Sequence, residues 1–130
     1  MKVILVENEP DIIEIYSFFV YDLFGEKTSV ETAGDGLQAI NKIMEHKYDL
    51  IWTDIKMPLM DGISLIKNLR QYSLPNATTP ILVTTAMESL IEELDTFGLN
   101  NLLCVKKPCG SEEITEALKQ LLPKMLLKPV

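Results

Sequence analysis

The sequence predicts an α/β protein built on one doubly wound, five-stranded parallel sheet. The first observation is size: the chain has 130 residues, of which 47% are hydrophobic, enough for the core of a single domain. The second is that short apolar runs, typical of buried strands, alternate with segments whose apolar residues recur at helical spacing. Near-continuous apolar strands between helices are typical of a parallel sheet that is covered on both faces.

Five strand–helix units follow one another along the chain. The expected strands are residues 3–6, 29–33, 48–53, 81–85 and 102–105, and the expected helices are residues 10–24, 36–45, 62–72, 89–97 and 111–122. Pro10 suits a first helical turn, where its missing N–H costs no hydrogen bond. Ser89, followed by Glu92, predicts a capping box at the start of the fourth helix.

The elements leave one long irregular stretch and one short end. Residues 73–80 are expected to form a loop into the fourth strand, in which Asn76 is a turn residue. We expect residues 1–122 to form one domain, followed by a short tail of residues 123–130 and no output domain.

Charge and composition exclude several classes of function. The formal net charge of −7, from 19 acidic and 12 basic residues, disfavours nucleic-acid binding, which depends on neutralising phosphates with Lys and Arg. No apolar run approaches the roughly 18 residues of a membrane span, so we expect a cytoplasmic protein without a membrane partner. The single histidine, His46, excludes a multi-histidine metal site, and two cysteines, Cys104 and Cys109, make no disulfide framework.

Polar side chains gather where the predicted strands end. In an open parallel sheet the carboxyl ends of the strands meet at one edge, where such folds bind ligands. The residues expected there are Glu7, Asn8 and Glu9 after the first strand, Asp54 after the third, Thr84 and Thr85 at the end of the fourth, and Lys106 and Lys107 after the fifth. Carboxylate and amide oxygens suit Mg²⁺, whereas lysine and threonine suit phosphate oxygens. A carboxylate can also accept a phosphoryl group covalently, and Asp54 is the candidate.

Four segments, in order, resemble the receiver domain of response regulators. They are "VILVENEP", "DLIWTDIKMPLMDG", "TPILVTTA" and "VKKP", with "TDIKMPLMDG" the most specific, and the resemblance extends over nearly the whole chain. It implies a flavodoxin-like topology with strand order 2-1-3-4-5. It also implies a stand-alone signalling receiver of two-component systems.

The resemblance assigns roles to individual residues. Asp54 would be the phosphoacceptor, Thr85 would bind the phosphoryl group, and Lys107 would reach it from the last strand, with a cis bond to Pro108. The Mg²⁺ ligands implied are Glu7, Asn8, Asp54 and the main-chain carbonyl of Lys56.

Two positions depart from the family pattern. Asn8 stands where the family usually has a second acidic residue, so we expect weaker Mg²⁺ binding, because an amide oxygen brings no formal charge. Cys104 stands three residues before Lys107, where the family often has an aromatic residue that moves during switching. A thiol is too small to fill the same volume, so the output surface is the part of the family pattern least transferable to this chain.

The leading functional hypothesis is a phosphorelay receiver that takes a phosphoryl group from a phosphohistidine onto Asp54. Such a protein is not an enzyme beyond its own phosphorylation and dephosphorylation, and its downstream target is not indicated by the sequence. The alternative is a phosphorylation-independent interaction module, suggested by Asn8 and Cys104. A phosphohydrolase is disfavoured because Lys56, two residues after Asp54, is no general acid carboxylate. A flavin-binding protein is disfavoured because the acidic loop "ENEPD" lacks residues that cradle phosphate.

The first helix suggests where the phosphodonor binds. Ile15 and Phe18 fall opposite the helical stripe that is expected to face the sheet, among Asp11, Glu14 and Asp22. The family typically docks its phosphodonor on this helix, and an apolar centre with a charged rim is typical of protein interfaces. We therefore expect a histidine kinase or a histidine phosphotransfer protein to dock near Ile15 and Phe18.

Overall fold

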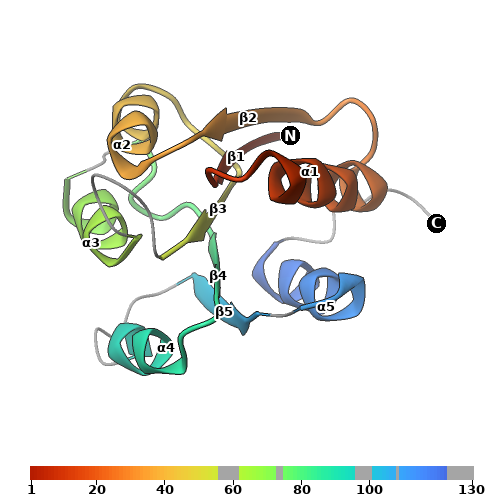
Figure 1. Cartoon of the computed structure of the whole chain (residues 1–130). Helices are drawn as coiled ribbons and strands as arrows, with labels where there is room; N and C mark the ends of the chain where they lie inside the picture. The colour runs from red at the N-terminus through yellow and green to blue at the C-terminus, as the bar shows by residue number, and fades with distance from the viewer. Residues whose placement is uncertain (56–61, 73–74, 96–100, 108, 123–130) are drawn as a thin grey trace.

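The computed structural model describes residues 1–55, 62–72, 75–95, 101–107 and 109–122 and confirms the predicted fold class (Figure 1). In chain order the elements are β1 (Lys2–Val6), α1 (Pro10–Phe24), β2 (Ser29–Ala33), α2 (Gly36–Glu45), β3 (Leu50–Asp54), α3 (Gly62–Tyr72), β4 (Ile81–Thr85), α4 (Glu88–Asp95), β5 (Leu102–Lys106) and α5 (Ser111–Leu121). The five strands form one sheet in the order β2-β1-β3-β4-β5, and every neighbouring pair is parallel. The predicted tail, residues 123–130, lies outside the described ranges.

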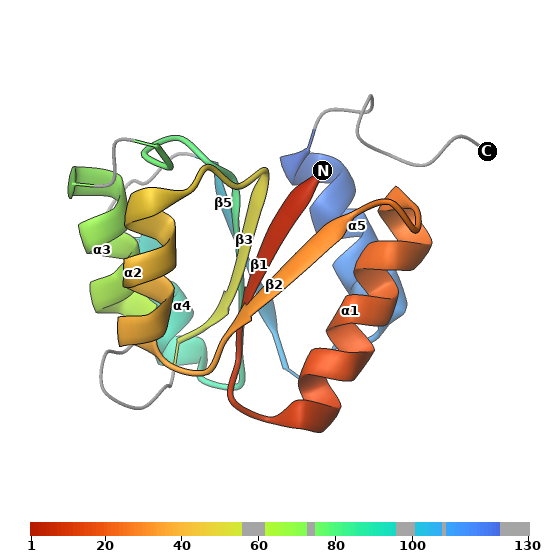
Figure 2. The ribbon, with the colours of Figure 1, turned by 90° about the horizontal axis from the view of Figure 1, so that it is seen from above.

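Helices cover both faces of the sheet, because alternate strand residues are apolar on both sides. Figure 2 shows α1 and α5 on one face and α2, α3 and α4 on the other. In β1, Val3 and Leu5 belong to the core under α1 and α5, whereas Ile4 and Val6 belong to the core under the other three helices. The strands run in one direction, so their carboxyl ends meet at the edge that faces the viewer in Figure 1.

The start of α4 corrects one sequence expectation. The helix begins at Glu88, so Ser89 is already its second residue and the predicted capping box at Ser89 is wrong. Just before the helix, the N–H of Met87 donates to Thr85 Oγ1 over 3.2 Å. The Thr85 hydroxyl at the end of β4 therefore stabilises the turn that leads into α4.

Asn76 has a larger role than that of a turn residue. It is fully buried, and its side-chain oxygen accepts a 2.8 Å hydrogen bond from the N–H of Tyr48. Its amide nitrogen donates to the carbonyls of Ile43 and His46 at the end of α2. Because the Tyr48 N–H bonds to this side chain, β3 begins at Leu50 and not at Tyr48 as expected.

None of the helices within the described ranges combines the length and the apolar character that crossing a bilayer requires.

Candidate functional site

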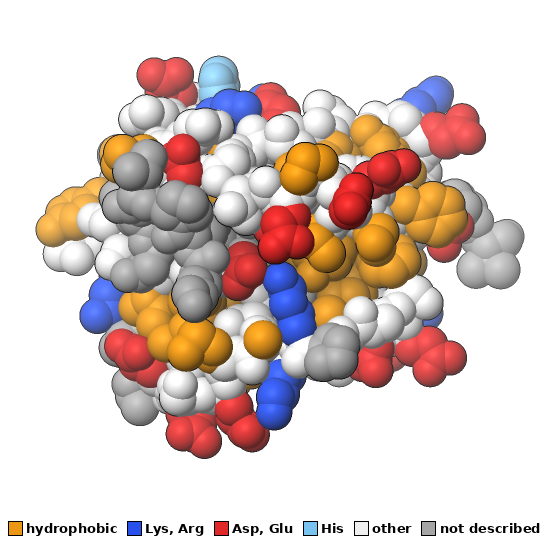
Figure 3. Space-filling view, in the orientation of Figure 1, with side chains coloured by type: hydrophobic (Ala, Val, Ile, Leu, Met, Phe, Trp, Pro, Cys, Tyr) orange, Lys and Arg blue, Asp and Glu red, His pale blue; other side chains and the backbone are white. Residues whose placement is uncertain are grey.

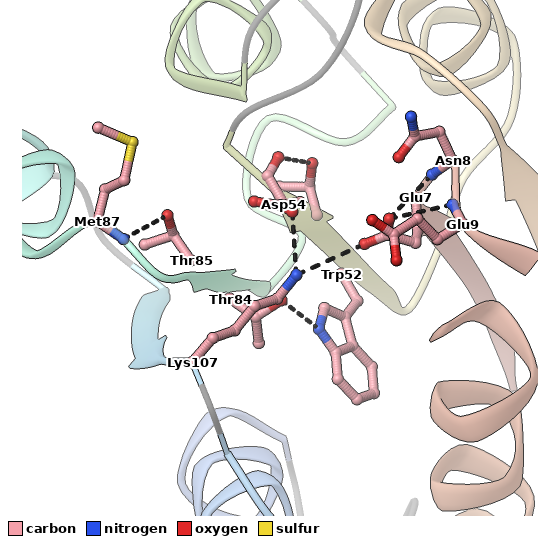
Figure 4. A network of polar contacts seen from close by, with 10 residues as sticks. Glu7, Asn8, Glu9, Trp52, Asp54, Thr84, Thr85, Met87 and Lys107 are labelled. Atoms are coloured by element: carbon pink, nitrogen blue, oxygen red, sulfur yellow. Dashed lines mark hydrogen bonds and ion pairs between the residues drawn. The ribbon is translucent and has the colours of Figure 1, made fainter. Parts of the chain in front are cut away.

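Glu7 is a buried carboxylate held by the turn that follows β1. Its Oε1 accepts hydrogen bonds from the backbone N–H groups of Asn8 and Glu9, over 3.1 and 3.2 Å. Its Oε2 is buried and, among the described residues, has no hydrogen-bond partner. This oxygen lies 3.8 Å from the ammonium nitrogen of Lys107, toward which Figure 4 shows the carboxylate pointing. Since an unsatisfied buried carboxylate oxygen is costly, its position indicates a site for cations.

Asp54 ends β3 and faces the same ammonium group. The Lys107 Nζ donates a 3.0 Å hydrogen bond to Asp54 Oδ2, and the Asp54 side chain is 17% exposed. The carboxylates of Glu7 and Asp54, from neighbouring strands, thus share one lysine. Solvent can reach Asp54, whereas Glu7 is closed off.

The backbone behind Asp54 is fixed by a close approach of α3. A Cβ at Gly62 would lie 2.5 Å from both the Asp54 carbonyl oxygen and the Ile55 Cα, so only glycine fits there. The Gly62 N–H also donates to the Ile55 carbonyl. The glycine of the sequence segment "MDG" therefore lets α3 start directly against the end of β3.

The two adjacent lysines point to different partners. Lys106 is exposed and pairs with Glu88 over 3.3 Å, as expected for a surface neighbour. Lys107 is half-buried: burial lowers its pKa, but the hydrogen bond and charge of Asp54, together with Tyr16 and Glu7, raise it to a net value above the ordinary one. Lys107 is therefore protonated at neutral pH and carries a positive charge between the two carboxylates.

Thr84 and Thr85 are both buried at the end of β4. The Thr85 hydroxyl accepts from the Met87 N–H, and in Figure 4 it lies on the opposite side of Asp54 from Glu7. The Thr84 hydroxyl accepts a 3.3 Å hydrogen bond from Trp52 Nε1, below Lys107. Of these two threonines, Thr85 is the one placed to approach a group bound at Asp54.

The donor set fits a magnesium ion, although Asn8 is not directed into the pocket. Asn8 is exposed, and Figure 4 shows its side chain extending away from Lys107. Lys56, whose carbonyl is the expected further ligand, lies outside the described residues. The described residues contain no group of three His, Cys, Asp or Glu residues arranged to hold a metal. Mg²⁺ needs only one or two carboxylates beside waters and phosphate, and Glu7 and Asp54 supply these, with Glu7 Oε2 still unsatisfied.

Both cysteine thiols have pKa values above the ordinary one. Burial raises the pKa of Cys104 to about 11, with a smaller contribution from Asp95. Burial also raises the pKa of Cys109, although the charge of Lys107 opposes this. Because the thiolate is the reactive form, neither residue is prepared for redox chemistry at neutral pH.

Sequence reasoning did not foresee the aromatic pair beneath the site. The rings of Tyr16 and Trp52 stack with their centroids 4.1 Å apart, and Trp52 is almost completely buried. The sequence does place Trp52 on the same face of β3 as Asp54, because the two residues are two positions apart in a strand. The contact with Tyr16 of α1 depends on the tertiary fold.

Comparisons with known proteins agree with this fold. The family model of the response regulator receiver domain matches residues 3–119. The CpxR homologue of Haemophilus influenzae, a transcriptional regulatory protein, is 31% identical over 121 residues, which cover 93% of this chain and 50% of that protein. The transcription factor SKN7 of Chaetomium thermophilum is 33% identical over 98% of this chain and 16% of its own length. The chain thus spans half or less of these relatives.

Solved structures show the same fold. The chemotaxis protein CheY4 of Vibrio cholerae superimposes with a TM-score of 0.77 at 29% identity, over 93% of this chain and 98% of that chain. The receiver domain of the sensor histidine kinase PA1611 of Pseudomonas aeruginosa, solved with a magnesium ion in its active-site cleft, has a TM-score of 0.75 at 24% identity, over 92% and 95% of the two chains. With a family match over most of its length and five parallel strands in the order 2-1-3-4-5, the chain belongs to the response-regulator receiver domains of two-component signalling.

Proposed function

We propose that this receiver domain accepts a phosphoryl group from a phosphohistidine donor onto Asp54. The observation that carries the proposal is the ammonium group of Lys107, held 3.0 Å from Asp54 Oδ2 and 3.8 Å from Glu7 Oε2. Asp54 is the carboxylate that solvent can reach, so it can accept the phosphoryl group. The Lys107 ammonium beside it can pair with the negative charge of the phosphoryl oxygens. The added charge would then bias a two-state surface toward a downstream partner.

The reaction requires few groups. An Asp54 carboxylate oxygen forms a bond to phosphorus as the bond between phosphorus and the donor's imidazole nitrogen breaks, and that nitrogen keeps the electron pair. Lys107, protonated at neutral pH, neutralises charge on the phosphoryl oxygens, and the Thr85 hydroxyl donates to one of them. Water then hydrolyses the aspartyl-phosphate and releases inorganic phosphate, which returns Asp54 to its free carboxylate and resets the domain.

We assign the Mg²⁺ site to Glu7, Asn8, Asp54 and the Lys56 carbonyl. A bound Mg²⁺ supplies positive charge that orients and neutralises the phosphoryl group. Glu7 is the fixed part of this set, because two backbone N–H groups hold its Oε1 and leave Oε2 available. Asn8 is the adjustable part, since its exposed side chain must turn inward to bind.

The Asn8→Asp substitution is expected to tighten Mg²⁺ binding about tenfold, which corresponds to roughly 1.4 kcal/mol. The reason is that a carboxylate adds a formal negative charge next to Glu7, a gain reduced by solvent at this exposed position. Isothermal titration calorimetry with Mg²⁺ measures the affinity of the variant and of the wild type. Asn41→Asp, which adds the same charge at an exposed position of α2, is the control. Equal affinities of Asn8→Asp and wild type would mean that Glu9 or a water molecule already takes the place of the missing carboxylate.

We propose that a histidine kinase or histidine phosphotransfer protein docks on α1. The Ile15 and Phe18 side chains are exposed, at 47% and 65%, and Figure 3 shows hydrophobic side chains, with acidic ones among them, over the part of this face that α1 occupies. A groove of about 350 Å³ connects this surface to the site, and it is lined by Ile12, Ile15, Tyr16, Phe19, Ala86, Lys107 and Cys109. A partner seated there would present its phosphohistidine beside Lys107.

The test of the proposed function is a covalent adduct. We expect incubation with acetyl phosphate and Mg²⁺ to add one phosphoryl group, seen by intact mass measurement, and Asp54→Asn to abolish it. Asp95→Asn, the same change at an exposed position of α4, is the control and is expected to keep the adduct. A wild-type chain that gains no phosphoryl group, although folded and supplied with Mg²⁺, would favour the phosphorylation-independent interaction module instead.

A further inference from the structure

A three-residue cluster lies beneath Lys107 on the α1–α5 face of the sheet. We call Tyr16, Trp52 and Thr84 the floor cluster. The Tyr16 and Trp52 rings stack with an interplanar angle of 17°, and Trp52 Nε1 donates to Thr84 Oγ1 over 3.3 Å. All three residues are buried, at 6%, 1% and 0% exposure. The cluster therefore has little freedom to rearrange.

The Tyr16 hydroxyl is coupled to Thr84 and Lys107. The Trp52 indole can only donate, so the Thr84 oxygen accepts from it and the Thr84 hydroxyl proton remains for another acceptor. Burial raises the pKa of Tyr16, whereas a hydrogen bond with Thr84 and the charge of Lys107 lower it, and Cys109 and Glu7 raise it. The net pKa is above the ordinary value, so the hydroxyl stays protonated and neutral, close to Thr84 and within the field of Lys107.

A rigid neighbour helps to position the Lys107 ammonium group. A lysine side chain has a flexible four-carbon stem, so placing its ammonium group costs conformational entropy. The ammonium is held by Asp54 and Glu7. Lys107 and Tyr16 also line the same groove, together with Cys109. Tyr16 is thus a buried, rigid neighbour of the lysine in this groove, and its hydroxyl is a neutral oxygen that does not compete for the positive charge as a carboxylate would.

We propose that Tyr16 is a positioning residue for Lys107, held in place by Trp52 and Thr84. This inference rests on the proposed function, and it adds a group of positioning residues on the α1–α5 side of the sheet. When Asp54 carries a phosphoryl group, Lys107 moves from the bare carboxylate to the phosphoryl oxygens, and the charge next to the floor cluster moves with it. Trp52 is the sole tryptophan of the chain, so its fluorescence reports this change.

The test compares two tyrosines of the same helix. Tyr16→Phe removes only the hydroxyl and is expected to slow phosphorylation by acetyl phosphate about tenfold, less than the roughly hundredfold that a misplacement of 1 Å costs. It is also expected to reduce the change in Trp52 emission on phosphorylation. Tyr21→Phe removes a hydroxyl from an exposed tyrosine outside the floor cluster and is expected to behave as wild type.

Substitutions at Thr84 separate positioning from packing. Thr84→Val keeps the volume and removes the hydroxyl, so it is expected to slow phosphorylation in the same way, and Thr84→Ser is expected to restore the rate. Because the Tyr16 and Thr84 hydroxyls are coupled, the double change of Tyr16→Phe with Thr84→Val is expected to slow phosphorylation by less than the product of the two single effects. Thermal unfolding of each variant identifies any variant that does not fold. If Tyr16→Phe does not fold, the comparison of Thr84→Val with Thr84→Ser still tests the positioning role.

The outcomes distinguish the two proposals. A wild-type rate together with a wild-type emission change in Tyr16→Phe would overturn the positioning role and leave the proposed function intact. Thr84→Ser that is as slow as Thr84→Val would also overturn it, since packing would then explain the loss. A wild-type chain that gains no phosphoryl group would overturn the proposed function and this inference together.

Discussion

Lys107→Ala is expected to slow phosphorylation of Asp54 by acetyl phosphate about a hundredfold, the lower end of what removing one preorganised electrostatic donor costs in an enzyme site. The physical reason is that Lys107 brings a positive charge to within 3.0 Å of Asp54. Without that charge the incoming phosphoryl group approaches two carboxylates with Mg²⁺ as the compensating cation. Burial of Glu7 strengthens the effect, because a buried charge is screened less by water.

Lys106→Ala is the matched control, one position away in the sequence. Its ammonium group is exposed and pairs with Glu88, so its removal is expected to leave the rate of phosphorylation unchanged. The measurement is the initial rate of the mass adduct at one fixed concentration of acetyl phosphate and Mg²⁺. Comparable losses in the two variants would show that the general charge at the end of β5, and not the contact of Lys107 with Asp54, controls phosphorylation.

The stability of Lys107→Ala must be measured beside its activity. Removing the lysine leaves Glu7 Oε2 buried without the cation it faces, and a buried carboxylate that loses its partner is destabilising. Addition of Mg²⁺ is expected to recover part of this loss, because the ion would take the place of the ammonium charge. A thermal unfolding curve with and without Mg²⁺ therefore separates loss of folding from loss of phosphoryl transfer.

The sequence was sufficient to predict the fold and the gathering of the strand ends. Five apolar runs of strand length, each followed by helical spacing, allow few arrangements other than a parallel sheet covered on both faces. In such a sheet the ends of β1, β3 and β5 must meet at one edge, so the approach of Glu7, Asp54 and Lys107 follows from topology alone. The strand order 2-1-3-4-5 came from the family resemblance and not from the pattern.

The residues that sequence reasoning missed owe their roles to contacts between distant segments. Asn76 has the composition signal of a loop, yet it is buried and bonds to backbone groups about thirty positions earlier, which no local pattern encodes. Trp52 and Thr84 meet only because β3 and β4 are paired in the observed register. The direction of the Asn8 side chain was also beyond prediction, since it depends on the turn that the Glu7 carboxylate organises.

Replacing Ile15 and Phe18 together with serine is expected to slow phosphotransfer from a protein donor about a hundredfold, the effect of losing roughly 2.7 kcal/mol of interface energy. Both side chains are largely exposed, so serine there should cost little folding stability. The Ile15 side chain lines the groove that leads to Lys107, which places the docking surface next to the phosphorylation site. Exposed apolar residues inside a rim of Asp11, Glu14 and Asp22 have the pattern of an interface anchor.

The same variant is expected to react with acetyl phosphate at the wild-type rate, because a small donor needs no docking surface. Leu37→Ser with Met44→Ser is the control: both residues are exposed apolar side chains, at 45% and 43%, but they lie on α2, across the sheet from α1. The measurement is transfer of labelled phosphate from a histidine phosphotransfer protein that phosphorylates the wild-type chain. Equal losses with the protein donor and with acetyl phosphate would indicate a folding role for the pair. Equal losses in the α1 and α2 variants would place the docking surface elsewhere, because α1 would then contribute no more to partner binding than a helix on the opposite face.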